Sequence, residues 1–295
     1  MTQRGAVAVE RRRRRLTGDR FYLLLVAVPC LFLAVFYFLP VANVLVLSVT
    51  EPILGLQNYA RLFESGALFR VLENTMRVSV VTTVLTLVLG YLVALGLIGA
   101  AERERRVLFF VVVASFWISA LIRAYAWVAI LQPNGIINQA LMSLGLIDTP
   151  LRLVRNEFGV IVGMVHYMLP YAILPLYANM SGIDRRLLDA ARALGASRWR
   201  TFCWVFFPQS LPGVAGAGIL VLIFSLGFYI TPAILGGGKV VMIAEYISIQ
   251  ISETLRWGLA TMLATVLVAA VVALTVWMSR YLQVGSAVTA KRRRP

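Results

Sequence analysis

The chain has 295 residues, of which 60% belong to the hydrophobic set AVILMFWYC and only 14% are charged, and its mean hydropathy is +0.83. So few charges cannot cover the apolar surface of a soluble chain of this length, which excludes a soluble globular enzyme, a disordered chain and a disulfide scaffold. The formal net charge is +15, and the two cysteines, Cys30 and Cys203, fit buried thiols better than a disulfide or a metal site.

Six stretches are long and apolar enough to cross a bilayer as helices, which takes about 20 residues each. They are 21–49, 78–101, 107–131, 158–181, 211–236 and 259–283. None shows the alternating pattern of a barrel strand, so the predicted fold class is all-α, a polytopic membrane protein with six transmembrane helices. The first stretch is too long for the apolar part of a signal peptide, and we interpret it as a retained anchor.

The positive charges predict an orientation for these helices. With a cytoplasmic N-terminus, the cytoplasmic pieces hold 20 of the 28 Lys and Arg residues, and the outer loops hold seven, balanced by seven acidic residues. This bias predicts that both termini are cytoplasmic. The domain organisation is then a basic N-terminal segment at 1–20, a six-helix transmembrane domain at 21–283 and a basic tail at 284–295. The basic excess orients the chain in the lipid bilayer, and nucleic acid is not an expected partner, because the Arg runs are short terminal pieces.

Motifs for catalysis or nucleotide binding are absent from the sequence. It contains no Walker-type phosphate loop, no GxSxG and no HExxH. No nucleophile–base pair or metal-ligand cluster appears among the spans, which disfavours an intramembrane enzyme. We therefore expect no catalytic residue, no metal and no cofactor on this chain. A non-catalytic membrane scaffold would share the topology and stays open as an alternative.

The cytoplasmic loop at 182–210 is much longer than a simple connection between two spans, which needs about 2–8 residues. Asp184 is placed to cap a short amphipathic helix, and Gly195 stands where a left-handed residue would end it. Ser197 is placed to cap a second, aromatic-rich helix that is expected to run to Pro208. The pattern predicts a helix–turn–helix on the cytoplasmic surface.

This loop resembles the EAA loop of ABC importer permeases, which reads Glu-Ala-Ala, three residues, Gly, nine residues, Ile, one residue, then Leu-Pro. The matching positions are Asp189, Ala190, Ala191, Gly195, Val205, Phe207 and Pro208. The resemblance implies an ATPase-coupling element that docks on a separate ATPase subunit, present in two copies, which would hold the ATP and Mg²⁺. The alternative is an amphipathic helix lying on lipid, with Asp189 paired to Arg186 or Arg192.

Nearly the whole chain is similar to the spermidine/putrescine-type permeases of binding-protein-dependent ABC importers. The similar stretches are 58–59, 121–125, 146–150, 168–170 and 227–229. The resemblance implies a bacterial inner-membrane permease that forms half of the translocation pathway for a small organic solute. Polyamine is the leading substrate, with an amino-acid-like or other small organic solute as the alternative. The implied partners are a second related permease, the two ATPases and a periplasmic substrate-binding protein.

Arg123 is the one charged side chain well inside a predicted span. Arg123 would cost about 2.5–3.5 kcal/mol at a helix centre. It lies eight residues from the end of its stretch, so it is expected either to snorkel to the outer surface or to line the mouth of the pathway. His166, the only histidine, is expected to be a hydrogen-bonded packing residue or, less simply, a proton relay.

Prolines and aromatic residues indicate where a pathway would run. Pro170 and Pro175 are expected to interrupt the fourth span and Pro232 the fifth, and broken helices often bound a pathway. Phe228 and Tyr229 stand just before Pro232, where they would form a gate or simply pack. Tyr125 and Tyr171 complete the pathway candidates. No Asp or Glu lies inside any span, so a buried carboxylate for specificity must come from a partner or from a loop residue such as Glu245 or Glu253.

Overall fold

The computed structural model describes the backbone of residues 25–291 and the side chains of residues 25–278, and all regular secondary structure in this part of the chain is helical. Five helices are long and apolar enough to cross a membrane: Leu25–Thr50, Gly66–Gly99, Glu157–Ser181, Arg198–Leu226 and Trp257–Met278. A sixth candidate is a bent pair, Glu102–Trp117 with Ala120–Ser143. The predicted all-α, polytopic fold class is confirmed. The expected N-terminal segment at 1–20 and the last residues of the expected tail lie outside the described range.

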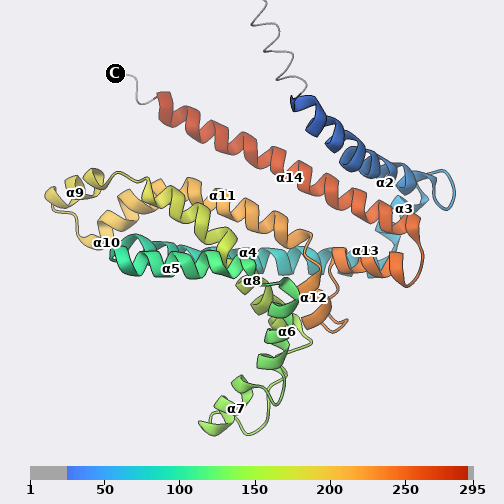
Figure 1. Cartoon of the computed structure of the whole chain (residues 1–295), viewed down its shortest axis with the longest axis horizontal. Coiled ribbons are helices and arrows are strands. Elements are labelled where there is room, and N and C mark those ends of the chain that lie inside the picture. The colour runs from blue at the N-terminus through green and yellow to red at the C-terminus, as the bar shows by residue number, and fades with distance from the viewer. Residues whose placement is uncertain (1–24, 292–295) are drawn as a thin grey trace, which may run out of the picture.

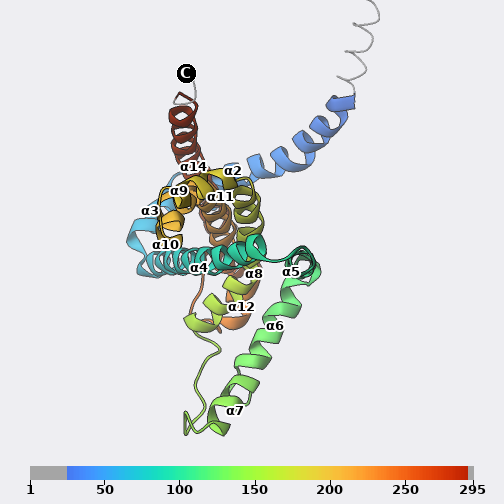
Figure 2. The ribbon, with the colours of Figure 1, turned by 90° about the vertical axis from the view of Figure 1, so that its left-hand side faces the viewer.

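The elements follow one another along the chain with mostly short connections, of which 144–156 is the longest. In order they are η1 (Ala34–Phe38), α2 (Leu39–Thr50), α3 (Gln57–Glu64), α4 (Gly66–Gly99), α5 (Glu102–Ala114), η2 (Ser115–Trp117), α6 (Ala120–Leu131), α7 (Ile136–Ser143), α8 (Glu157–Ser181), α9 (Arg185–Ala193), α10 (Arg198–Thr201), η3 (Phe202–Phe206), α11 (Phe207–Leu226), α12 (Ile230–Leu235), α13 (Ile243–Ser252) and α14 (Trp257–Lys291). α9 and α10 lie at one end of the molecule and α3 and α13 at the other (Figure 1). α6 and α7 project from the body (Figure 2).

The core is a bundle in which α4 and α11 both pack along α8. Small residues let these helices approach closely, as is common between membrane helices. A Cβ atom on Gly90 would lie 3.0 Å from the Cβ of Ala172, and one on Gly213 only 2.6 Å from the Cβ of Asn179. The α8–α11 contact at Gly213 therefore tolerates no side chain without movement.

The first helix, Leu25–Thr50, is the least buried of the five candidate spans, and no residue of its apolar 18-residue window is buried. Cys30 is exposed on it and Cys203 is half-buried. The expectation of two buried thiols is wrong for Cys30, because hydropathy reports a membrane span but not which protein surface covers it.

The third predicted span, 107–131, is not one straight helix. The backbone turns extended at Ile118 and Ser119, and the two helical segments on either side are bent by 102°. No proline stands here, so the hydropathy pattern carried no sign of the break.

The predicted proline interruptions are wrong in position. α8 continues as one helix through Pro170 and Pro175. The fifth stretch breaks at 227–229, between α11 and α12. Pro232 is the third residue of α12, within the first turn, where a missing N–H leaves no helical bond unmade.

Candidate coupling loop and aromatic cluster

The first helix of the 182–210 loop has the predicted caps. The Asp184 side chain accepts a hydrogen bond of 2.9 Å from the backbone N–H of Arg186. Gly195 has φ +86°, and its N–H donates to the carbonyl of Arg192 while the next N–H, of Ala196, donates to the carbonyl of Ala191 at 3.1 Å. This pair of bonds defines a Schellman motif, which needs a left-handed residue at the glycine position. The predicted cap and helix end are confirmed.

The loop presents apolar side chains that nothing in the described chain covers. Leu194 is 89% exposed, Trp204 82% and Trp199 73%. Asp189 and Ala190 are exposed beside them, while Ala191 is half-buried. Exposed aromatic and aliphatic groups of this size favour a surface that meets lipid or another protein.

The Asp189 carboxylate makes one weak contact. Its Oδ1 lies 3.9 Å from Nη1 of Arg192, and both side chains are more than half exposed. A pair at this separation in water contributes little to stability. The carboxylate therefore stays available to a partner.

The second helix of the loop does not end at Pro208 as predicted. α10, η3 and α11 form one uninterrupted helix from Arg198 to Leu226, capped by the Ser197 side chain. Pro208 is the second residue of α11, directly after the π-turn η3, in which the N–H of Phe207 donates to the carbonyl of Phe202. A π-turn re-pairs the backbone where a proline lacks its donor, so the helix continues. Val205 lies in this turn, and its carbonyl accepts from Nε2 of Gln209 at 3.0 Å.

At its far end this helix reaches a cluster of aromatic side chains. Ring centroids lie 4.6 Å apart for Tyr167 and Phe228, and 4.9 Å apart for Tyr171 and Phe224. Phe116, in η2, adds an edge contact to Tyr171 at 4.9 Å. Three segments thus meet here: the bend before α6, the middle of α8 and the end of α11.

Two of the four aromatic pathway candidates belong to this cluster, and two lie outside it. Phe228 and Tyr171 are half-buried within it, whereas Tyr229 is 44% exposed and Tyr125, on α6, is 62% exposed. Sequence reasoning missed Tyr167 and Phe224. Their spacing of four residues before Tyr171 and Phe228 places each pair on one helix face, which is a signal that the sequence does carry.

Arg123 lies at the bend beside the aromatic cluster, and its side chain turns inward instead of snorkelling to the surface. Its side chain is buried, with 7% exposed. Nε and Nη2 donate to the carbonyl of Ile118 at 3.2 and 2.9 Å, and Nη2 also donates to the carbonyl of Ser115. The guanidinium carbon lies 4.7 Å from the ring centroid of Tyr167. The side chain thus turns back toward the start of α6. It pairs the carbonyl of Ile118, for which the bend leaves no helical donor, and adds a donor to the carbonyl of Ser115.

His166 accepts a hydrogen bond at Nδ1 from Nε1 of Trp127, at 3.2 Å. The bond joins α8 to α6 next to the aromatic cluster. This partner accounts for one ring nitrogen and fits the packing interpretation of the histidine.

Glu245 is the one carboxylate that is nearly buried in the described chain, with 7% of its surface exposed. It lies in α13, outside the membrane-spanning segments, and burial raises the pKa of its carboxyl group. Its Oε2 has no hydrogen-bond partner among residues 25–278. The second loop candidate, Glu253, is exposed.

The sequence of the chain is similar to those of known transport permeases. The family described as "Binding-protein-dependent transport system inner membrane component" matches residues 5–284. The spermidine/putrescine transport system permease protein PotB of Salmonella typhimurium is 34% identical over 232 residues, which cover 78% of this chain and 80% of that protein. A putative 2-aminoethylphosphonate transport system permease protein, PhnU of Salmonella paratyphi A, is 29% identical, covering 69% of this chain and 71% of PhnU.

A solved structure shows the same fold. A chain of a bacterial ABC transporter that imports the acidic polysaccharide alginate superposes with a TM-score of 0.74 over 91% of this chain and 98% of that chain, at 20% identity. The resemblance to ABC importer permeases is confirmed, and the enzyme and scaffold alternatives fall with it. The chain therefore belongs to the family of binding-protein-dependent transport system inner membrane components, and it is a non-catalytic, multi-pass inner-membrane permease subunit of an ABC importer.

Proposed function

We propose that this permease forms half of a translocation pathway for polyamines and that the 182–210 loop transmits ATP-driven movement to it. The second half comes from a related permease, two ATPase subunits dock on the loop, and a periplasmic binding protein delivers the substrate. Both termini and the loop face the cytoplasm.

One observation carries the coupling proposal. α9, with Asp189, packs against α10 and η3, and these begin a helix that runs without a break from Arg198 to Leu226. This helix ends at the aromatic cluster that includes Phe228. A push on the loop therefore reaches the cluster through a single stiff element.

The proposed substrate has separate support. PotB, at 34% identity, is a spermidine/putrescine permease by name. Aromatic faces attract ammonium groups by about 0.5–2 kcal/mol each, and the cluster offers several such faces. The relative named for 2-aminoethylphosphonate favours the alternative, an amino-acid-like or other small organic solute. Uptake of radiolabelled spermidine into cells that express the whole importer, with 2-aminoethylphosphonate and unlabelled amino acids as competitors, separates the two.

Gly195→Val tests the coupling role. A β-branched residue at φ +86° costs about 1–2 kcal/mol locally and tilts α9 without touching the aromatic cluster. We expect normal membrane insertion with loss of uptake and of substrate-stimulated ATP hydrolysis. Gly145→Val is a matched control, because Gly145 also has positive φ and open space around it but lies outside the loop. Normal uptake by Gly195→Val at normal expression would contradict the proposal.

Cysteine labelling tests the orientation. In a background without Cys30 and Cys203, a membrane-impermeant maleimide applied to sealed cells is expected to label Glu64→Cys and Glu253→Cys. Arg198→Cys should stay unlabelled until the cells are opened. Labelling of position 198 from outside would overturn the orientation.

A further inference from the structure

A pocket lies where three membrane-spanning helices begin or end. The first helix ends at Thr50, α4 begins at Gly66 and α14 begins at Trp257. The pocket between them has a volume of about 540 Å³ and is lined by residues of these helix ends, of α3 and of α13. Two of the elements that line it, α3 and α13, lie at the opposite end of the molecule from α9 (Figure 1).

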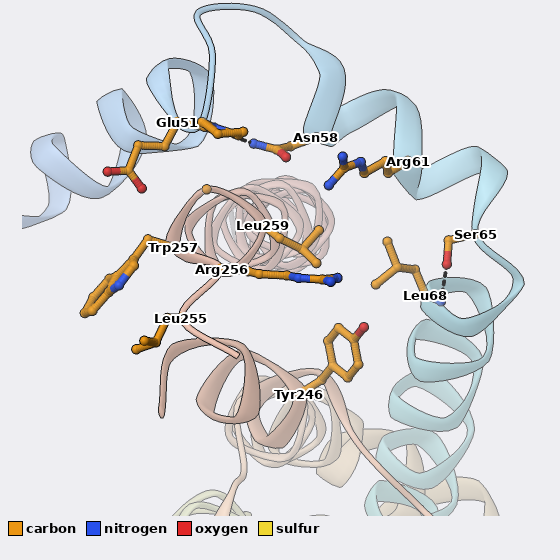
Figure 3. A pocket seen from close by; sticks show the side chains of 12 residues that line it. Glu51, Asn58, Arg61, Ser65, Leu68, Tyr246, Leu255, Arg256, Trp257 and Leu259 are labelled. Carbon is orange, nitrogen blue, oxygen red and sulfur yellow. Dashed lines mark hydrogen bonds between the residues drawn. The ribbon is translucent and has the colours of Figure 1, made fainter. Parts of the chain in front are cut away.

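Two guanidinium groups point into this pocket from different elements. The side chains of Arg61, from α3, and Arg256, from the segment before α14, extend into the pocket, which Tyr246 also lines (Figure 3). No carboxylate lies within 4.0 Å of either arginine in the described chain. Glu51 also lines the pocket, but its carboxylate points away from both guanidinium groups (Figure 3). The pocket therefore has an excess of positive charge and fits an anion.

The wall of the pocket is held in place by its own hydrogen bonds. Nδ2 of the buried Asn58 donates to the carbonyl of Glu51 at 2.7 Å, which closes the turn between the first helix and α3. The Ser65 side chain accepts from the N–H of Leu68 and caps α4. The two arginines thus project from positions that the fold fixes without them.

The rim of the pocket is apolar on one side. Leu255, which lines the pocket, is 68% exposed, and Ile53 and Leu54, which follow the lining residue Pro52 in the chain, are 63% and 78% exposed. Trp257, 46% exposed, opens α14 at the same level, and tryptophan is enriched where the hydrocarbon of a bilayer gives way to headgroups. Three spans end at this depth, so the cationic pocket opens at the membrane–water boundary. An apolar rim beside paired arginines at that depth suits a lipid better than the polar surface of a soluble protein.

We propose that this pocket binds the headgroup of an anionic phospholipid. Arg61 and Arg256 hold the phosphate, since planar guanidinium groups donate paired hydrogen bonds to phosphate oxygens. The Tyr246 hydroxyl donates to the headgroup, and the acyl chains lie along the exposed leucines of the rim. The site ties the start of α14 to α3 through a bound lipid, and it does not depend on which solute the importer carries.

The test uses the purified full-length permease in a neutral detergent. Phosphatidylglycerol is expected to raise the Tm of the wild-type protein more than phosphatidylcholine does. The double variant Arg61→Gln, Arg256→Gln should lose more than half of that difference, and Arg61→Lys with Arg256→Lys should recover part of it. Arg70→Gln with Arg152→Gln is the matched control. It removes the same charge from exposed arginines outside the pocket and should keep the full response.

Four outcomes would overturn the proposal. The first is an equal rise with both lipids, and the second is a full phosphatidylglycerol response in the double glutamine variant. The third is the same rise with inorganic phosphate alone, which would assign the pocket to a free anion. The fourth concerns the assembled importer. If the double glutamine variant loses the stimulation of ATP hydrolysis by the binding protein while the purified permease keeps its lipid response, the arginines belong to a protein contact.

Discussion

Replacing Arg123 tests whether its side chain holds the bend between α5 and α6. In Arg123→Ala the carbonyl of Ile118 loses its guanidinium donors, whereas the carbonyl of Ser115 keeps the backbone N–H of Ile118. A carbonyl left without a partner away from water costs about 1–3 kcal/mol. Loss of the contact with the Tyr167 ring adds about 0.5–2 kcal/mol. Removal of a buried charge offsets part of this, so we expect the bend to lose about 1–3 kcal/mol.

A loss of that size shifts the equilibrium between bent and other arrangements of α5 and α6 measurably, because each 1.4 kcal/mol is a factor of about ten in an equilibrium constant. Spin labels at positions 110 and 139, in α5 and α7, would report the bend by their distance distribution. The wild type should give one narrow distribution, and Arg123→Ala should give a broad or second one. Arg123→Lys keeps a charge but offers fewer donors, so it should fall between the two.

The control for this experiment is Ile122→Ala on the same helix, because Ile122 is 65% exposed in the described chain and makes no bond to the bend. It should leave the distance distribution unchanged. An unchanged distribution and an unchanged Tm in Arg123→Ala would refute the assignment of the bend to this arginine.

Three further outcomes are expected. Burial raises the pKa of Glu245 above its ordinary value of 4.5, so the stability that its protonated carboxyl group contributes is complete below pH 4.5 and is lost as pH rises through the raised pKa. The Tm of Glu245→Gln should therefore rise relative to that of the wild type on going from acid to neutral pH. Parallel pH profiles of the two Tm values would contradict this. Phe228→Ala with Tyr229→Ala should raise basal ATP hydrolysis or solute leak if the two rings close the pathway, and should change neither if they only pack. Gly213→Val should lower the Tm by a clash with Asn179, whereas Gly216→Val, with open space around it, should not.

The sequence predicted best what depends on local chemistry. Asp184, Gly195 and Ser197 act through backbone groups one to three residues away, so a capped helix and a left-handed turn could be predicted from spacing alone. The number of apolar stretches likewise follows from composition, because the bilayer demands about 20 apolar residues whatever the fold.

The predictions failed where a side chain beyond the nearest helical turn, or a neighbouring helix, decides the structure. The bend at Ile118 has no proline or glycine to mark it, and the group that pairs its carbonyls comes from Arg123, one turn into the next helix. Proline predicted helix breaks that do not occur, because α8 continues through Pro170 and Pro175. Neighbouring helices and hydroxyl side chains satisfy backbone groups that a proline frees, and a single sequence does not show those neighbours.

The contact between Gly213 and Asn179 has a mechanical consequence. Gly213 stands close to the midpoint of the uninterrupted helix from Arg198 to Leu226, which is about 43 Å long at 1.5 Å per residue. A helix held at its middle and pushed at one end pivots, so the two ends move by similar amounts in opposite directions. Approach of the Arg198 end to the core of the bundle then withdraws the Leu226 end from the aromatic cluster. One close-packed glycine thus makes the helix a lever in which closing on one side of the membrane is opening on the other.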